Sequence, residues 1–301
     1  MVTGATGFIG RHVVASLHRQ GYEVHAVARR VPSAGTARVH WHVGDLLTPG
    51  LAPQLIAAAA PDALIHLAWE VGTGGAWQSD LNDRWRRATG ELVEAFAAPD
   101  RRALLAGTCA EYQWDESVCA EQGTPIRPAT RYGQAKDGAR TDADAIARRE
   151  GLSLVWARIF FTFGPGESPQ RLISSIVRTV LAGGLAQATH GRQVRDYLYV
   201  EDLADALVAL LASDVRGQVN VASGVPVDLG WLATRAAQLA GDPQRLELGA
   251  LAPRPDEPRR ILADVGRLRD EVGWRPRVGI EEGLARTVAW WRTQTGAAGA
   301  S

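Results

Sequence analysis

The feature that most constrains the fold is a glycine-rich segment at the very start of the chain. It reads Val-Thr-Gly-Ala-Thr-Gly-Phe-Ile-Gly over residues 2–10, and apolar residues recur at helical spacing over residues 9–17. At a strand-to-helix junction, Gly4 permits a tight turn, Gly7 lets the backbone approach a pyrophosphate, and Gly10 lets the helix pack closely on the strand. The amides and the positive end of the helix dipole would then face phosphates. The segment therefore predicts a dinucleotide-binding site.

Apolar strands and amphipathic helices alternate through the first half of the chain. Strands are expected at residues 23–28, 39–43, 63–68, 103–106 and 153–158, and helices at residues 51–60, 82–97 and 130–149. The strand at 63–68 is apolar throughout, as expected when helices cover both faces of a sheet. This alternation predicts an α/β fold with a right-handed, doubly wound parallel sheet.

After residue 160 the alternation loosens. Further helices are expected near residues 170–181, 201–211, 229–240, 265–272 and 281–292, with strands at 196–200 and 219–221. We expect residues 1–160, joined by residues 193–222, to form the dinucleotide-binding domain. Residues 161–192 and 223–301 are expected to form a smaller, mostly helical lobe that covers the cofactor cleft and binds substrate.

Charge and cysteine content exclude several functional classes. Lys+Arg and Asp+Glu each number 33, so no net field attracts nucleic acid or an anionic membrane. The only two cysteines, Cys109 and Cys119, form no CxxC motif, and the seven histidines show no paired ligand spacing, so no dedicated metal site is expected. Without a leader segment or a bilayer-spanning apolar run, the chain is expected to be cytoplasmic.

Two arginines at the end of the second expected strand bear on the choice of cofactor. An NAD site usually carries an acidic residue about 20 residues after the glycines, to hold the ribose hydroxyls. Here no carboxylate lies between Glu23 and Asp45, and Arg29 and Arg30 occupy the expected place. Their guanidinium groups suit a 2′-phosphate, and the less favoured alternative is that both are solvated surface residues. We expect NADP(H), with NAD as the alternative.

Three side chains form a candidate catalytic group. Tyr132 and Lys136 lie four apart, on one face of an expected helix. The ammonium should stabilise the phenolate and lower its pKa, so that Tyr132 exchanges a proton with a substrate oxygen while Lys136 grips a ribose hydroxyl. Thr108, just past a strand, can hold the same oxygen or simply cap the strand end. Trp69 can stack on a base or sugar, or pack in the core.

Together these residues resemble the extended short-chain dehydrogenase/reductase family, the epimerase/dehydratase type that acts mostly on nucleotide sugars. The resemblance covers nearly the whole chain and implies a Rossmann-type sheet. The cofactor contacts that it implies are Gly4, Thr6, Gly7, Phe8, Ile9, Gly10, Asp45, Leu46, Leu67, Ala68, Tyr132 and Lys136. It also implies Thr108, Tyr132 and Lys136 as catalytic residues, and Arg195 and Arg254 as ligands of the substrate diphosphate. Members often form homodimers through the helices corresponding to 82–97 and 130–149.

Departures from the family pattern narrow the expected reaction. Sugar-nucleotide dehydratases carry an Asp-Glu pair directly after the catalytic Thr, where this chain has Cys109 and Ala110. Neither residue can protonate or deprotonate a sugar, so dehydration is not expected. Glu111 lies one residue later and is expected either to reach the substrate or to pair with an arginine. Phe161 stands where many epimerases have an Asn, so it is expected to shape a different substrate pocket.

The favoured hypothesis is an NADPH-dependent ketoreductase that reduces a nucleotide-activated keto-(deoxy)sugar, with Tyr132 as proton donor. The alternative is a nucleotide-sugar 4-epimerase that retains NAD. A third possibility, a non-catalytic redox-sensing protein, is disfavoured because such relatives typically lose the Tyr/Lys pair. No nucleic-acid or membrane partner is expected.

Overall fold

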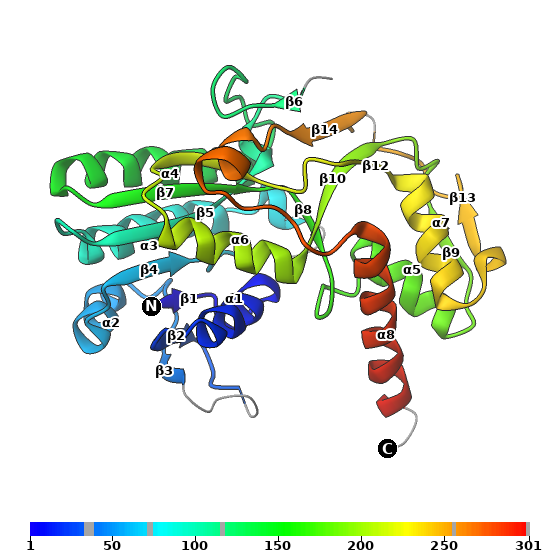
Figure 1. Ribbon diagram of the computed structural model, residues 1–301, viewed down its shortest axis with the longest axis horizontal. Coiled ribbons are helices and arrows are strands. Elements are labelled where there is room, and N and C mark those ends of the chain that lie inside the picture. Colours follow the sequence, from blue (N-terminus) through cyan, green and yellow to red (C-terminus); the bar gives the residue numbers. More distant parts are fainter. Residues whose placement is uncertain (33–38, 71–74, 115–117, 255–256, 299–301) are drawn as a thin grey trace.

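A computed structural model describes residues 1–32, 39–70, 75–114, 118–254 and 257–298 (Figure 1). Its main sheet has seven parallel strands in the order β11-β7-β5-β4-β1-β2-β3. The strands are β1 (Val2–Thr3), β2 (Val24–Ala28), β3 (Val39–Val43), β4 (Ala63–His66), β5 (Arg102–Thr108), β7 (Ser153–Ile159) and β11 (Gly217–Val221). The expected doubly wound, Rossmann-type sheet is confirmed.

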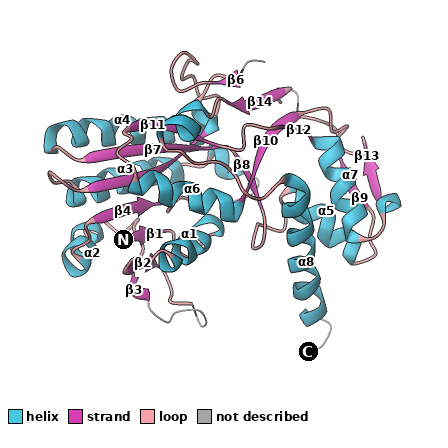
Figure 2. Cartoon of the chain, in the orientation of Figure 1, coloured by secondary structure: helices cyan, strands magenta, loops and turns pink. Residues whose placement is uncertain are grey.

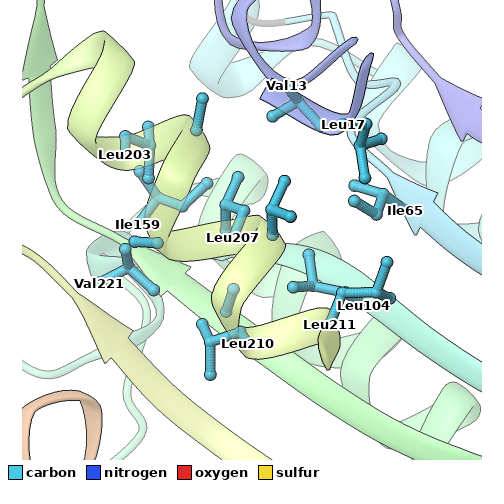
Figure 3. Close-up of a cluster of buried hydrophobic side chains, with 14 of the residues drawn as sticks. Val13, Leu17, Ile65, Leu104, Ile159, Leu203, Leu207, Leu210, Leu211 and Val221 are labelled. Atoms are coloured by element: carbon cyan, nitrogen blue, oxygen red, sulfur yellow. The ribbon is translucent and has the colours of Figure 1, made fainter. Parts of the chain in front are cut away.

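Helices cover both faces of this sheet. They are α1 (Phe8–Arg19), α2 (Leu51–Ala59), α3 (Leu81–Phe96), α4 (Arg131–Glu150) and α6 (Val200–Ala212). Helices α1 and α6 share one apolar core with the strands, and α2, α3 and α4 pack in a second core on the opposite face. Figure 3 shows Leu203 and Leu207 of α6 near Ile159, with Val13 and Leu17 of α1 on the other side of the cluster. Burial on both faces explains why the central strands are apolar throughout.

A second, smaller layer of structure follows β7. Its sheet contains β12 (Pro226–Asp228), β10 (Val194–Tyr199), β14 (Arg260–Ala263), β6 (Val118–Cys119) and β8 (Phe161–Phe163), and a separate pair contains β9 (Ala186–Ala188) and β13 (Leu246–Leu248). Helices α5 (Leu172–Leu181), α7 (Leu229–Ala240) and α8 (Ile280–Ala298) pack together on a core of their own, at the other end of the molecule from α2, α3 and α4 (Figure 2). Short helical turns are η1 (Gly75–Gln78), η2 (Cys109–Glu111), η3 (Pro243–Arg245) and η4 (Arg267–Glu271).

The segment 193–222 divides between the two sheets. Strand β10 pairs with β8, β12 and β14, whereas α6 and β11 belong to the seven-stranded sheet. Residues 193–199 therefore pair outside the seven-stranded sheet, while Leu198 of β10 packs in the core that α1 and α6 share. The reason is that β8 follows β7 after a single residue, Phe160, and pairs in register with β10. None of the described helices is long and apolar enough to span a membrane.

Candidate active site

The glycine loop links β1 to α1 and leaves the start of the helix open. Gly4 has φ +68°, and a Cβ there would lie 2.7 Å from the amide nitrogen of Ala68. A Cβ on Gly10 would lie 2.0 Å from the carbonyl oxygen of Gly4, so helix and turn are in direct contact. Gly7 is the N-cap of α1, where no side chain caps the helix and no acidic residue occupies the first turn. The uncapped amides fit a pyrophosphate group.

The other predicted cofactor residues differ in how far they are exposed to solvent. Thr6, Arg29, Arg30 and Asp45 are exposed, Phe8, Ile9, Leu67 and Ala68 are half-buried, and Leu46 is buried. The Leu46 side chain packs against Val27 and Leu55. The Asp45 carboxylate accepts the amide of Leu47, which holds the turn after β3. No described acidic residue pairs with Arg29 or Arg30, which lie directly after β2.

The three predicted catalytic side chains are brought together. Thr108 is the last residue of β5, and Tyr132 and Lys136 lie in the first turns of α4. The hydroxyl of Thr130 caps that helix by accepting the amide of Gly133 at 3.1 Å. Thr108, Tyr132 and Lys136 are all buried, and Thr108 hydrogen-bonds the phenol of Tyr132. A hydroxyl and a phenol therefore face the same point above the carboxyl edge of the sheet.

The Tyr132 phenol is a weaker acid than the sequence predicts. Burial raises its pKa above the ordinary value, and the hydrogen bond with Thr108 and the positive charge of Arg171 offset this only in part. The expectation that Lys136 lowers the pKa of Tyr132 is therefore wrong. The phenol keeps its proton at neutral pH.

The Lys136 ammonium is held by the backbone of β5 and by Trp69. Its Nζ donates to the carbonyl of Ala106 at 2.8 Å and lies 3.9 Å from the ring centroid of Trp69. Burial lowers the pKa of this lysine to about 7. The cation–π contact with the indole favours the charged form. With a pKa near neutral pH, Lys136 can be either protonated or deprotonated under ordinary conditions.

Trp69 holds the lysine instead of offering a free face. Its Nε1 donates to Asn82 Oδ1 at 2.9 Å, and its ring stacks on Trp85 with 6.3 Å between centroids. With Lys136 over the same indole, the predicted stacking on a base or sugar is not supported. Half-buried Trp77, whose ring lies 5.6 Å from that of Tyr132, is better placed for such stacking.

Glu111 lies beneath the site and does not reach it. Its side chain is 0% exposed. One carboxylate oxygen accepts the amide of Thr108 at 2.8 Å, and the other accepts Nε of Arg158 at 2.7 Å. Nε1 of Trp156 donates to the same carboxylate at 3.0 Å. The assignment of Glu111 to substrate binding is therefore corrected: it positions the backbone of Thr108.

Among the predicted substrate residues of the second layer, Phe161 lies beside the buried Arg195. Arg195 is 3% exposed, donates to the carboxylate of Glu257 at 3.1 Å and lies 5.5 Å from the ring of Phe161. Phe161 is half-buried, and Arg254 is exposed on the loop that leads to Glu257. Arg195 interacts electrostatically with Cys109, directly after Thr108, so it approaches the catalytic group. An anionic ligand that binds Arg195 would have to compete with the Glu257 carboxylate for the guanidinium group.

Sequence reasoning missed Arg171. This exposed residue is the N-cap of α5, and its positive charge lowers the pKa of both Tyr132 and Tyr197. It is therefore the cation of the second layer that acts most directly on the phenol. The available signal was a lone basic residue at the start of a helix, shortly after the turn at residues 164–166.

His66, at the end of β4, is part of the support of the site. Its two ring nitrogens lie 2.7 Å from Thr3 Oγ1 and 2.9 Å from Thr89 Oγ1. Burial lowers its pKa to about 3, so it stays neutral. It fixes the strand end beside the glycine loop.

Comparisons with known proteins agree with this geometry. Residues 1–222 match the model of the NAD dependent epimerase/dehydratase family. UDP-glucuronic acid decarboxylase 1 of Xenopus tropicalis is 29% identical over 98% of this chain and 72% of that protein. A dTDP-glucose 4,6-dehydratase of Xanthomonas campestris is 26% identical over 97% of this chain and 93% of its own length.

Solved structures show the same similarity. MoeE5 in complex with UDP-glucuronic acid and NAD has a TM-score of 0.84 and 31% identity, covering 97% of this chain and 98% of that one. A Thermus thermophilus UDP-glucose 4-epimerase complex with NAD has a TM-score of 0.86 and 26% identity, with 97% and 98% coverage. The chain thus belongs to the NAD dependent epimerase/dehydratase family, of the extended short-chain dehydrogenase/reductase type.

Proposed function

We propose that this protein is an NADPH-dependent ketoreductase that reduces a nucleotide-activated keto sugar. The observation that carries the proposal is the acid–base content of the site: one phenol, Tyr132, hydrogen-bonded to one hydroxyl, Thr108. Dehydration needs a further acid and base, yet Ala110 has no titratable group and burial raises the pKa of the Cys109 thiol. Glu111, the next residue, is held by Arg158. Hydride transfer with a single proton donor is the chemistry that this set supports.

The residues of the chain have separate parts in that reaction. In this proposal the amides at the start of α1 bind the pyrophosphate and Lys136 binds the nicotinamide ribose. A reduced nicotinamide, when bound, supplies the hydride to the carbonyl carbon. Tyr132 gives its proton to the carbonyl oxygen while Thr108 orients that oxygen, so hydride plus proton convert C=O to CH–OH. The phenolate left behind lies near the charge of Arg171, which stabilises it until it regains a proton from solvent.

The cofactor preference rests on two side chains. Arg29 and Arg30 are exposed at the carboxyl end of β2 and have no acidic partner among the described residues. Their planar cationic groups suit the 2′-phosphate that distinguishes NADPH from NADH. A reductase consumes its cofactor and releases it after each turnover, which is the usual role of NADPH.

The second candidate is a nucleotide-sugar 4-epimerase that retains NAD. It is favoured by the similarity to a UDP-glucose 4-epimerase and to MoeE5, both solved with NAD. An epimerase must first oxidise its substrate, and for that step Tyr132 must act as a base. Burial raises the pKa of Tyr132, so the phenol carries its proton at neutral pH, which is the form that the reductase needs and the epimerase's oxidation step does not.

Two measurements separate these candidates. Calorimetric titration should show tighter binding of NADPH than of NADH, and nucleotide extracted from freshly purified protein should contain no stoichiometric NAD. NADPH oxidation with a panel of nucleoside-diphosphate keto sugars should fall roughly 10²- to 10⁴-fold in Tyr132→Phe. Tyr22→Phe, at an exposed tyrosine, is the matched control. Retained NAD, or a clear preference for NADH, would select the epimerase instead.

A further inference from the structure

A cluster of imidazoles lies on the paired strands β2 and β3, where the sequence spacing predicts no metal site. The two strands are parallel, and His25 is the direct partner of His40. Because alternate residues of a strand face the same side, His42 lies on that face as well. Glu23 precedes β2, and the ligand atoms of Glu23, His25 and His40 all lie within 4.8 Å of one another. Strand pairing thus brings together ligands that are far apart in the chain.

The spacing of these atoms matches a metal coordination shell. Nε2 of His25 lies 3.3 Å from Oε1 of Glu23, and Nε2 of His40 lies 3.4 Å from the same oxygen. Tetrahedral zinc with bonds of about 2.0–2.1 Å separates its ligand atoms by about 3.3–3.4 Å. The two distances from the Glu23 oxygen therefore match those around one ion, and all three donors lie within 4.8 Å of one another.

His42 supplies the support that a metal-bound histidine commonly has. Its Nε2 lies 2.9 Å from Nδ1 of His25, the nitrogen that does not face Glu23. When His25 donates its Nδ1 proton to His42, its Nε2 lone pair is left for a cation. This hydrogen bond is compatible with the tautomer of His25 that can bind metal through Nε2.

We propose that Glu23, His25 and His40 bind a divalent transition-metal ion of the Zn²⁺ class, with water in the remaining position. Imidazole nitrogen with one carboxylate favours Zn²⁺, Ni²⁺ or Cu²⁺ over Mg²⁺ or Ca²⁺. The ligands lie at the amino ends of β2 and β3, whereas Arg29 and the glycine loop lie at the carboxyl edge. The ion therefore takes no part in hydride transfer. It joins β2 to β3, the strand at the free edge of the sheet (Figure 1).

Metal titration of the full-length protein tests this site. After treatment with a chelator, one equivalent of Zn²⁺ should bind per chain and raise the melting temperature, and Co²⁺ should give a visible absorption band. His25→Ala and His40→Ala should each weaken Zn²⁺ binding by about tenfold or more. His40 is exposed, so its replacement leaves the core intact. Circular dichroism and NADPH titration confirm that the variants remain folded.

His18→Ala is the matched control, because His18 is exposed at the end of α1 and is not one of the clustered ligands. It should bind Zn²⁺ as the wild type does. Equal Zn²⁺ affinity of His40→Ala and the wild type, or equal loss in His18→Ala, would overturn the site.

Discussion

The buried ion pair between Glu111 and Arg158 makes a strong and measurable prediction about stability. The two groups are 2.7 Å apart, and their side chains are 0% and 2% exposed. Glu111→Gln keeps an oxygen for the amide of Thr108 but leaves the guanidinium of Arg158 in the interior without a counter-charge. Removing one partner of a buried pair costs about 3–5 kcal/mol. The variant should lose that much free energy of unfolding.

Urea unfolding, followed by tryptophan fluorescence, measures this loss. The matched control is Glu94→Gln, which makes the same chemical change in the exposed pair that Glu94 forms with Arg149. That pair is solvated, so the control should cost about 0–1 kcal/mol. Replacing both buried partners, Glu111→Leu with Arg158→Met, should recover part of the loss. Equal costs for Glu111→Gln and Glu94→Gln would refute the reasoning.

Three further changes test the site. The Cβ of Gly7→Ala would lie 3.1 Å from the Gly4 carbonyl oxygen, so this variant should stay folded but bind NADPH more weakly in calorimetry. The Cβ of Gly10→Ala would lie 2.0 Å from the same oxygen, so this variant should instead have a sharply lower melting temperature. The same outcome for both variants would contradict these separate roles. Arg29→Ala should weaken NADPH by roughly 10- to 100-fold and leave NADH unchanged, and equal effects on both cofactors would rule out a 2′-phosphate contact. Burial lowers the pKa of Lys136 from 10.5 to about 7, so between these values the unfolded chain binds one more proton than the folded chain, and the free energy of unfolding rises with pH by up to about 1.4 kcal/mol per pH unit. In urea unfolding at several pH values, the free energy of unfolding of the wild type should therefore increase with pH relative to that of Lys136→Met. If the two free energies instead changed with pH in the same way, the pKa of Lys136 would not be lowered by burial.

The parts of the site that could be predicted from the sequence are local. The glycine loop can be predicted because its three glycines precede apolar residues at helical spacing. The pairing of Tyr132 with Lys136 can be predicted because the two residues lie one helical turn apart. In both cases the geometry is set by hydrogen bonds within a single turn or helix, so spacing along the chain carries the information.

The contacts that were mispredicted depend on strand pairing. For Glu111 the sequence left two outcomes open, contact with substrate or pairing with an arginine, because its partners lie on β7, where Arg158 pairs in register with Gly107 of β5. A Cβ on Gly107 would lie 2.1 Å from Nε1 of Trp156 and 2.7 Å from the Glu111 carboxylate, so that glycine makes room for the network. Only the sheet brings these groups together. The altered pKa of Tyr132 likewise follows from burial, which no local spacing reveals.

The two separately packed cores have a consequence for how such enzymes diversify. Thr108, Tyr132 and Lys136 stand on the seven-stranded half, whereas Arg171 and Arg195 stand on the half built around α5, α7 and α8. Mutations within the core that α5, α7 and α8 share leave the core of α2, α3 and α4, which contains Tyr132, untouched. Under the proposed function, substrate preference can therefore change through α5, α7 and α8 while the proton donor keeps its surroundings, and a chimera that exchanges the core residues of these three helices with those of a relative tests this.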